Sequence, residues 1–271
     1  RGLGDVYKRQ GARKDADLAR LDLMDNISAV RLDVTVNEDV AAAVEFVKAQ
    51  GRGLWGIVNN AGVYRYAPLI GGPESDFRLT LDVNVLGPIR INQAFVPLVA
   101  ESGGRTAVIG SLSGFIPEAE DGGYAASKFA MEGYTDSLAM ELEKTGVHVA
   151  IVEPGSFKSN IRGTMFQAAM AAAESGQLDL SQAAQEGLAS SVDRNESMKD
   201  PDEVAQAVLH LMTSDTPKRR YMVAPNARQA AITIRYAMAR MLELNEDQPY
   251  AYSRDELVAL LDELMNESDR N

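Results

Sequence analysis

The chain has 271 residues, of which 45% are hydrophobic, so one domain of this length can bury a sizeable core. Its net charge of −12 argues against nucleic-acid binding, because phosphate recognition needs clustered lysine and arginine. The sequence contains no cysteine, which excludes a disulfide framework, a thiolate nucleophile and cysteine-based zinc sites, and which fits a cytoplasmic protein without a resident metal.

The first third of the chain alternates helical and strand patterns. We expect a helix over residues 16–23 and a strand over residues 29–32. Residues 37–49 carry apolar side chains at helical spacing, and residues 54–58 form a second apolar strand. Such alternation is typical of an α/β fold built on a parallel sheet.

The middle of the chain continues this alternation. A long helix is predicted over residues 77–99, with a kink or break at Pro88 near Asn84, because proline lacks the amide N–H that a helix needs. A buried strand, a core helix and a β-branched strand follow at residues 106–109, 125–144 and 147–152. No stretch of about 20 apolar residues occurs, so we expect no transmembrane segment.

The last part of the chain begins with residues 156–200, which lack a strand pattern and are rich in alanine, glutamine and serine. Their Met165 and Met170 either line an adaptable apolar pocket or pack within the segment itself. A further helix is predicted to start near Pro201, and a last strand follows at residues 221–224. Two amphipathic helices are predicted after it, at residues 226–244 and 253–265. We expect the two final helices to form a subunit contact or to cover a substrate site rather than to dock on a membrane, because the second one is acidic.

Small or polar residues follow the predicted strands. They are Asp33–Val34, Asn59–Gly62, Ser111 and Pro154–Gly155. The carboxyl ends of parallel strands meet at one edge of an open α/β sheet, where ligands bind. The sequence therefore predicts a nucleotide-binding crevice at this edge.

Tyr124 and Lys128 are four residues apart in the predicted core helix, so they lie on one face of it. An ordinary tyrosine has a pKa near ~10, too high for a base at neutral pH. The lysine ammonium is expected to lower this pKa toward the range in which general acid–base catalysis is efficient. The pair is therefore a candidate proton donor and acceptor.

The chain resembles the short-chain dehydrogenase/reductase family over residues 18–225. The motifs that carry the resemblance are, in order, Asn59-Asn60-Ala61-Gly62, Asn84, Ser111, Tyr124-x-x-x-Lys128 and Pro154-Gly155. The resemblance implies a doubly wound parallel sheet of the Rossmann type, a nicotinamide cofactor and hydride transfer between a secondary alcohol and a ketone or aldehyde. Residues 127–161 are similar to members that act on hydroxysteroids, retinoids and other apolar carbonyls.

One part of the family pattern is not found in this sequence. The family opens with a strand, a glycine-rich turn and a helix that bind the pyrophosphate, and residues 1–10 show none of these signals. We therefore expect a sheet that lacks its first strand, glycine-rich turn and first helix, which would expose sheet edges and weaken folding and cofactor binding. We expect an artefactual leader at residues 1–10 and a single domain at residues 11–225. Within this domain, residues 156–200 would form a substrate lid, and residues 226–271 would follow it as a helical extension. A divergent member with a shortened N-terminus is the alternative.

The resemblance also implies roles for four side chains. Tyr124 would exchange the hydroxyl proton, Lys128 would lower the pKa of Tyr124 and hold the nicotinamide ribose, and Ser111 would position the substrate oxygen. Asn84 would hold a water that extends the proton relay. Ser113 is the alternative to Ser111, and a helix cap is the alternative role for Asn84.

The cofactor contacts implied by the resemblance follow the strand ends. Besides Tyr124 and Lys128 they are Asp33, Val34, Asn60, Ala61 and Gly62 on the adenosine side, and Pro154, Gly155, Phe157 and Ser159 on the nicotinamide side. Asn59 is expected to tie strands together instead. In this family the residues after the second strand distinguish NAD from NADP. At this position the chain has two cations, Arg13 and Lys14, and no acid. This favours the 2′-phosphate of NADP, with NAD as the alternative.

The predicted function is therefore that of an NAD(P)-dependent oxidoreductase acting on a small apolar carbonyl or alcohol. A nucleotide-binding redox sensor without turnover is one alternative, and an inactive fragment of the enzyme is another. The presence of all four implied catalytic side chains argues against the sensor. Family members often form homo-oligomers, and the sequence leaves the oligomeric state open.

Overall fold

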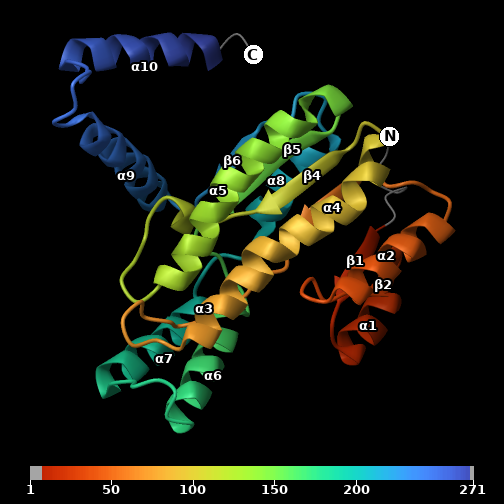
Figure 1. Cartoon of the computed structure of the whole chain (residues 1–271). Coiled ribbons are helices and arrows are strands. Elements are labelled where there is room, and N and C mark those ends of the chain that lie inside the picture. Colours follow the sequence, from red (N-terminus) through yellow and green to blue (C-terminus); the bar gives the residue numbers. More distant parts are fainter. Residues whose placement is uncertain (1–7, 269–271) are drawn as a thin grey trace.

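The computed structural model describes residues 8–268, which form a mixed α/β structure (Figure 1). Its strands are β1 (Lys8–Ala12), β2 (Ile27–Arg31), β3 (Gly56–Asn59), β4 (Arg105–Ile109), β5 (His148–Pro154) and β6 (Arg220–Val223). Its α-helices are α1 (Asp15–Asp22), α2 (Asn37–Ala49), α3 (Glu74–Leu81), α4 (Gly87–Ala100), α5 (Gly122–Leu142), α6 (Ile161–Glu174), α7 (Gln182–Glu196), α8 (Asp202–Thr213), α9 (Ala227–Asn245) and α10 (Arg254–Ser268). This alternation confirms the predicted fold class.

The strands form two separate parallel sheets. β1 pairs with β2, while β3, β4, β5 and β6 pair in that order. Within residues 8–268 no strand lies between β1 and β3, and the side chain of Val58 on the β3 edge is 44% exposed. The exposed edge that the sequence predicted is therefore present, and Figure 1 shows β1 and β2 set apart from β4 and β5.

A shared helical layer holds the two sheets together. Val40, Ala43 and Val47 of α2 and Ile91 and Phe95 of α4 form one buried cluster. Side chains from both sheets pack against this cluster, among them Val30, Leu32 and Ile57. Apolar contact with α2 and α4 thus connects the two sheets, which share no paired strands among residues 8–268.

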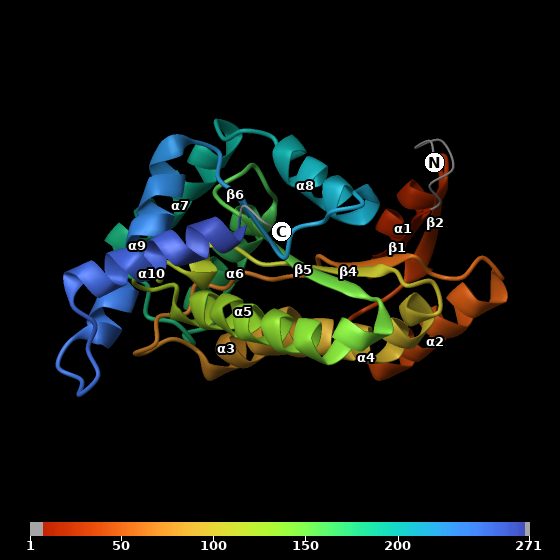
Figure 2. The ribbon, with the colours of Figure 1, turned by 90° about the horizontal axis from the view of Figure 1, so that it is seen from above.

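The four-stranded sheet is covered on both faces, with α5 on one side and α8 on the other (Figure 2). Successive side chains of a strand point to opposite faces, so Ile151 packs with Met131 of α5, and Val152 packs with Leu211 of α8. Burial of both faces explains why β5 reads as a continuous apolar run in the sequence.

The segment between β5 and α8 folds into two packed helices, α6 and α7. Met165 and Ala169 of α6 meet Leu188 of α7 in a buried cluster, and Met170 packs against its edge. Of the two alternatives for Met165 and Met170, the structure supports packing within the segment itself. Ser181 caps α7, since its hydroxyl accepts a hydrogen bond of 3.2 Å from the amide of Ala184.

The C-terminal helices are only partly packed. In α9, Thr233 is buried and the guanidinium of Arg240 lies 4.8 Å from the centroid of the Phe129 ring in α5. Several apolar side chains of α9 and α10 remain exposed, among them Met238, Leu242, Leu244, Leu261 and Met265. Across residues 8–268, no helix combines the length and apolar character that crossing a membrane requires. The role expected for these helices stays a prediction.

The predicted domain bounds also stay a prediction. β1 begins at Lys8, so residues 8–10, which we expected to belong to a leader, form part of a strand paired with β2. Residues 1–7 lie outside the described part of the chain.

Candidate active site

Ser111 lies just beyond the end of β4, before a short 3-10 turn over Leu112–Gly114. Its Oγ accepts a hydrogen bond of 3.1 Å from the amide of Ser113, which fixes the start of this turn. Burial raises the pKa of Tyr124, and hydrogen bonding with the Ser111 hydroxyl partly offsets this rise. Of the two serines, Ser111 is the one whose hydrogen bonding acts on the pKa of Tyr124, and the choice of Ser111 over Ser113 stays a prediction.

The helix α5 places Tyr124 and Lys128 one turn apart. The Lys128 Nζ lies 5.5 Å from the centroid of the Tyr124 ring, and it donates a hydrogen bond of 2.9 Å to the carbonyl oxygen of Ile109. Ile109 is the last residue of β4, two residues before Ser111. Lys128 thus ties α5 to the strand end that carries Ser111, and the structure brings the three predicted side chains together.

Burial dominates the pKa values of both groups on α5. It raises the pKa of Tyr124 to about 12, an effect that hydrogen bonding with Ser111 opposes and the Asp121 carboxyl increases. It lowers the pKa of Lys128 to about 8, against the attraction of the Glu132 carboxylate. The sequence led us to expect a lowered pKa for Tyr124. The direction is the opposite because burying a phenolate costs more than its favourable contacts return.

Asn84 lies in a single π-helical turn, Asp82–Leu86, between α3 and α4. This residue is 3% exposed. Its Oδ1 accepts a hydrogen bond of 2.8 Å from the amide of Val63, and its Nδ2 donates one of 2.9 Å to the Val63 carbonyl. The same Nδ2 also donates a hydrogen bond of 3.0 Å to Ser127 Oγ. These contacts join the loop after β3 to α5, so Asn84 is not a helix cap. Single π-helical turns are frequent at functional sites. The predicted break near Pro88 is confirmed, because α4 begins at Gly87.

Three residues that the sequence did not single out surround the Tyr124 phenol. The Tyr64 ring packs on the Tyr124 ring, with centroids 4.8 Å apart and planes tilted by 42°. Asp121, directly before α5, is 7% exposed, and burial raises its pKa to about 7, against hydrogen bonding with Tyr64. The charge of Arg162 in α6 weakly opposes the rise that burial causes in the pKa of both Asp121 and Tyr124. No local pattern marks these residues, because they come from three separate segments.

A cavity of about 200 Å³ lies beside the ends of β1 and β2. It is lined by Gly11, Ala12, Arg13, Leu32, Asp33, Val34, Ala61, Gly62, Val63 and Val83, five of which the sequence predicted as cofactor contacts. The Asp33 carboxylate accepts hydrogen bonds from the amide and hydroxyl of Thr35 at 2.9 and 2.7 Å, and Arg13 Nη1 lies 3.4 Å from it. Although burial opposes the effect, these contacts lower the pKa of Asp33, which stays a charged acceptor.

The chemistry of this cavity fits the adenosine end of a dinucleotide. It combines a carboxylate acceptor, apolar walls and glycines that let a ligand approach the backbone. Arg13 is 57% exposed at the rim, where its charge can meet a phosphate. Asn60, which the sequence grouped with these residues, is exposed and does not line the cavity.

The residues predicted for the nicotinamide side follow one another at the end of β5. They are Pro154, Gly155, Phe157 and Ser159. A Cβ at Gly155 would lie 2.7 Å from Pro225 Cδ, just before α9, so a side chain at this position would require Pro225 to shift. Phe157 is buried, whereas Ser159 is exposed and donates its amide N–H to Asn195 Oδ1 of α7 at 3.0 Å.

Asn59 belongs to the core rather than to the site. Its Nδ2 donates to Asn92 Oδ1 at 3.3 Å, to Thr106 Oγ1 at 3.3 Å and to the carbonyl of Ala107 at 3.2 Å. It therefore ties β3 to β4 and α4, as the sequence predicted.

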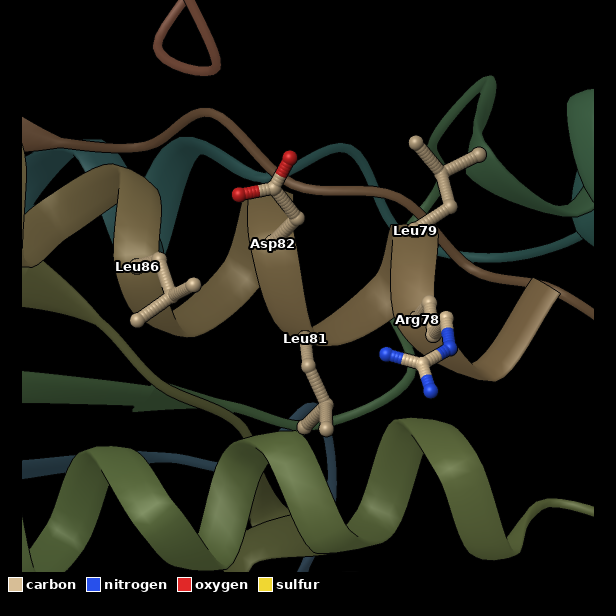
Figure 3. Close-up of a pocket in the computed structure, with 5 residues that line it drawn as sticks. All are labelled: Arg78, Leu79, Leu81, Asp82 and Leu86. Atoms are coloured by element: carbon tan, nitrogen blue, oxygen red, sulfur yellow. The ribbon is translucent and has the colours of Figure 1, made fainter. Parts of the chain in front are cut away.

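A larger cavity of about 400 Å³ lies along α3 and the π-helical turn, away from the predicted side chains (Figure 3). It is lined by Arg78, Leu79, Leu81, Asp82 and Leu86. Asp82 is paired with Arg90 at 2.7 Å, and no candidate catalytic residue lines this cavity. Among residues 8–268, no cluster of three or more potential metal ligands is present.

A family model described as short chain dehydrogenase matches residues 6–169 of the chain. Retinol dehydrogenase 7 of Mus musculus is 39% identical over 174 residues, which cover 59% of this chain and 55% of that protein. The chain thus spans about half the length of these curated relatives of the retinol dehydrogenase group.

Solved structures show the same fold. A short-chain dehydrogenase from Streptomyces avermitilis has a TM-score of 0.72 and 24% identity, covering 90% of this chain and 86% of its own. A short chain dehydrogenase from Burkholderia cenocepacia, crystallised in complex with NADP, has a TM-score of 0.65 and 21% identity, covering 88% and 85%. At these identities the likeness concerns the fold.

Proposed function

The chain belongs to the short-chain dehydrogenase family, and we propose that it is an NAD(P)-dependent oxidoreductase that interconverts a secondary alcohol and a ketone or aldehyde. The observation that carries the proposal is the meeting of Tyr124, Lys128 and Ser111 at the end of β4. A proton donor, a nearby cation and a hydroxyl that can orient an oxygen are the groups that this reaction needs around its carbonyl.

Each side chain has one task in the proposed reaction. Tyr124 gives its proton to the carbonyl oxygen on reduction and takes it back on oxidation. Ser111 donates a hydrogen bond to the same oxygen and positions it. Lys128, fixed by the carbonyl of Ile109, supplies a positive charge on the same face of α5, although burial keeps the pKa of Tyr124 above its ordinary value. A bound nicotinamide would supply or accept the hydride.

Asn84 serves the same reaction indirectly. Its hydrogen bonds to Val63 and Ser127 hold the loop after β3 against the helix that carries Tyr124 and Lys128. A water held at this junction would extend the path of the proton beyond Lys128.

NADP is the preferred cofactor in this proposal. Arg13 stands at the rim of the adenosine-sized cavity, 3.4 Å from Asp33, and no acidic side chain occupies its place at the end of β1. A cation at this point suits a ribose 2′-phosphate, whereas an acid would suit a free 2′-hydroxyl. The NADP complex of the Burkholderia cenocepacia relative agrees with this choice.

The proposed substrate is a small to medium apolar alcohol or carbonyl. The relative named retinol dehydrogenase suggests such a class, and the α6–α7 lid is built on an apolar cluster that includes Met165 and Tyr66. The cytoplasmic location and the oligomeric state expected from the sequence stay open.

The test is NADPH oxidation with a panel of ketones and aldehydes, for the chain and for a Tyr124→Phe variant. We expect turnover that falls by about 10²-fold or more in the variant, because phenylalanine keeps the ring packing against Tyr64 and removes the proton. Ser113→Ala is the matched control and should keep most of the activity. Tight NADPH binding without turnover of any carbonyl, unchanged by the variant, would support the redox sensor instead.

A further inference from the structure

A cluster of charged side chains lies behind Lys128, where α5 meets β5 and β6. This charged cluster consists of Glu132 and Asp136 of α5, Glu153 of β5 and Arg220 of β6. Arg220 Nη1 donates to Glu132 Oε2 and, at 3.0 Å, to Glu153 Oε1, while its Nη2 donates to Asp136 Oδ2 at 2.6 Å. The side chains of Glu132 and Glu153 are 12% and 3% exposed, so two carboxyls share one guanidinium where water has little access.

Glu132 also lies against the turn that carries Ser111. Gly114 and Gly110 have no side chain, and a Cβ added at either would approach this carboxyl. At Gly114 the added Cβ would lie 2.9 Å from Glu132 Oε1 and 3.3 Å from the carbonyl oxygen of Lys128. At Gly110 it would lie 3.4 Å from the same Oε1. Gly110 and Gly114 flank Ser111, so the carboxyl fits a space that side chains at these positions would close. Oε1 is buried and has no hydrogen-bond partner among the described residues. Pairing with Arg220 therefore accounts for one oxygen of Glu132 and not for the other.

Lys128 is a buried cation that needs a compensating charge. Tyr124, whose ring lies beside Lys128 on α5, is uncharged at neutral pH because burial raises its pKa to about 12, and the Lys128 Nζ bonds only the carbonyl of Ile109 among the described residues. Burial lowers the pKa of Lys128 to about 8, and the attraction of the Glu132 carboxylate opposes that effect. Without this carboxylate the pKa of Lys128 would be lower still.

Burial raises the pKa of Glu132, and the hydrogen bond and charge of Arg220 oppose this rise and favour the carboxylate. Burial and the neighbouring Glu132 carboxylate raise the pKa of Glu153 to about 7, whereas Arg220 acts to lower it. If the two buried carboxyls share one proton, we expect Glu153 to carry it, because Glu153 is the less exposed of the two. Asp136 is half exposed and also binds Arg219, so it lies toward solvent and away from Lys128.

We propose that Glu132 is a positioning residue that acts through Lys128: its carboxylate keeps this buried lysine protonated and holds the turn that carries Ser111. The catalytic role of Glu132 rests on the proposed function, because only that reaction uses Lys128 as a cation. The effect of Glu132 on the charge of Lys128 does not rest on it, and it can be measured whether or not the protein turns over a substrate.

The test measures that charge state directly. Protein labelled with ¹³C at lysine Cε is titrated by NMR, and Lys128→Arg identifies the Lys128 signal among the eight lysines of the chain. The titration midpoint of Lys128 is then compared in the wild type, Glu132→Gln and Glu132→Asp. Asp136→Asn is the matched control, since it removes a carboxylate from the same helix and the same Arg220.

We expect the midpoint to fall by about one pH unit in Glu132→Gln and to stay near the wild-type value in Asp136→Asn. In Glu132→Asp the carboxylate is withdrawn by one methylene, and we expect a smaller fall in the same direction. Thermal unfolding shows which variants fold, and an unshifted midpoint in whichever Glu132 variant folds overturns the proposal. An equal fall in Asp136→Asn overturns it too, because the effect would then belong to the charged cluster as a whole.

Failure of the proposed function gives a different result. A wild-type chain without NADPH-linked turnover, combined with a shifted midpoint in Glu132→Gln, would refute the oxidoreductase and leave the electrostatic role of Glu132 intact. Turnover with an unshifted midpoint would keep the oxidoreductase and overturn the role.

Discussion

Replacing Asp121 by asparagine should stabilise the protein at neutral and alkaline pH and leave it almost unchanged in acid. Asp121 is 7% exposed beside Tyr64, and burial raises its pKa from the ordinary value of 3.8 to about 7. A carboxyl whose pKa is higher in the folded than in the unfolded protein takes up a proton on folding. Its ionised form therefore opposes folding, and stability declines as the pH rises from about 4 to about 7 and stays low above that.

The size of the effect follows from the two pKa values. The gap between 3.8 and about 7 corresponds to a penalty of about 4 kcal/mol at pH 8, as an order of magnitude. Asparagine has nearly the same shape and cannot ionise, so Asp121→Asn removes the penalty. We expect its advantage over the wild type to be small near pH 4 and to grow to a few kcal/mol at pH 7 to 8.

The assay is the free energy of unfolding in urea, measured between pH 4 and pH 9 for the wild type, Asp121→Asn and Asp193→Asn. Asp193 is an exposed carboxyl of α7, and its substitution should shift the curve little at any pH. A difference between the wild type and Asp121→Asn that stays constant over this range would refute the reasoning, because it would mean that Asp121 does not change its protonation on folding.

Two further predictions concern the cofactor cavity and the π-helical turn. Arg13→Ala should weaken NADPH binding about tenfold and leave NADH binding unchanged, as measured by cofactor fluorescence, because the arginine meets a 2′-phosphate that NADH lacks. Equal losses for both cofactors would contradict the assignment of Arg13. Asn84→Ala should lower the free energy of unfolding by about 2 kcal/mol, since the amide and carbonyl of Val63 lose their buried partner. Urea unfolding checks this value, and an unchanged midpoint would show that water replaces the side chain without cost.

The sequence by itself determined several features that depend on local geometry. The apolar spacing over residues 37–49 predicted α2 at its observed bounds, Asn37–Ala49. Four-residue spacing placed Tyr124 and Lys128 on one face of α5, because the helix repeats every 3.6 residues whatever packs around it. Polar residues after apolar strands located the edge of the sheet where the site lies, since parallel strands all end on the same side.

Only the tertiary structure decided the electrostatics of the site. Tyr64, Asp121 and Arg162 meet around Tyr124 from three segments, and Glu132, Glu153 and Arg220 meet behind Lys128 from three elements. Burial, with a further contribution from Asp121, raises the pKa of Tyr124, opposite to the expected direction. The geometry of a helix is set by hydrogen bonds between residues a few positions apart in one segment. The desolvation of a charged group, in contrast, depends on every segment that packs against it. The first property can therefore be derived from neighbouring residues, and the second requires the folded chain.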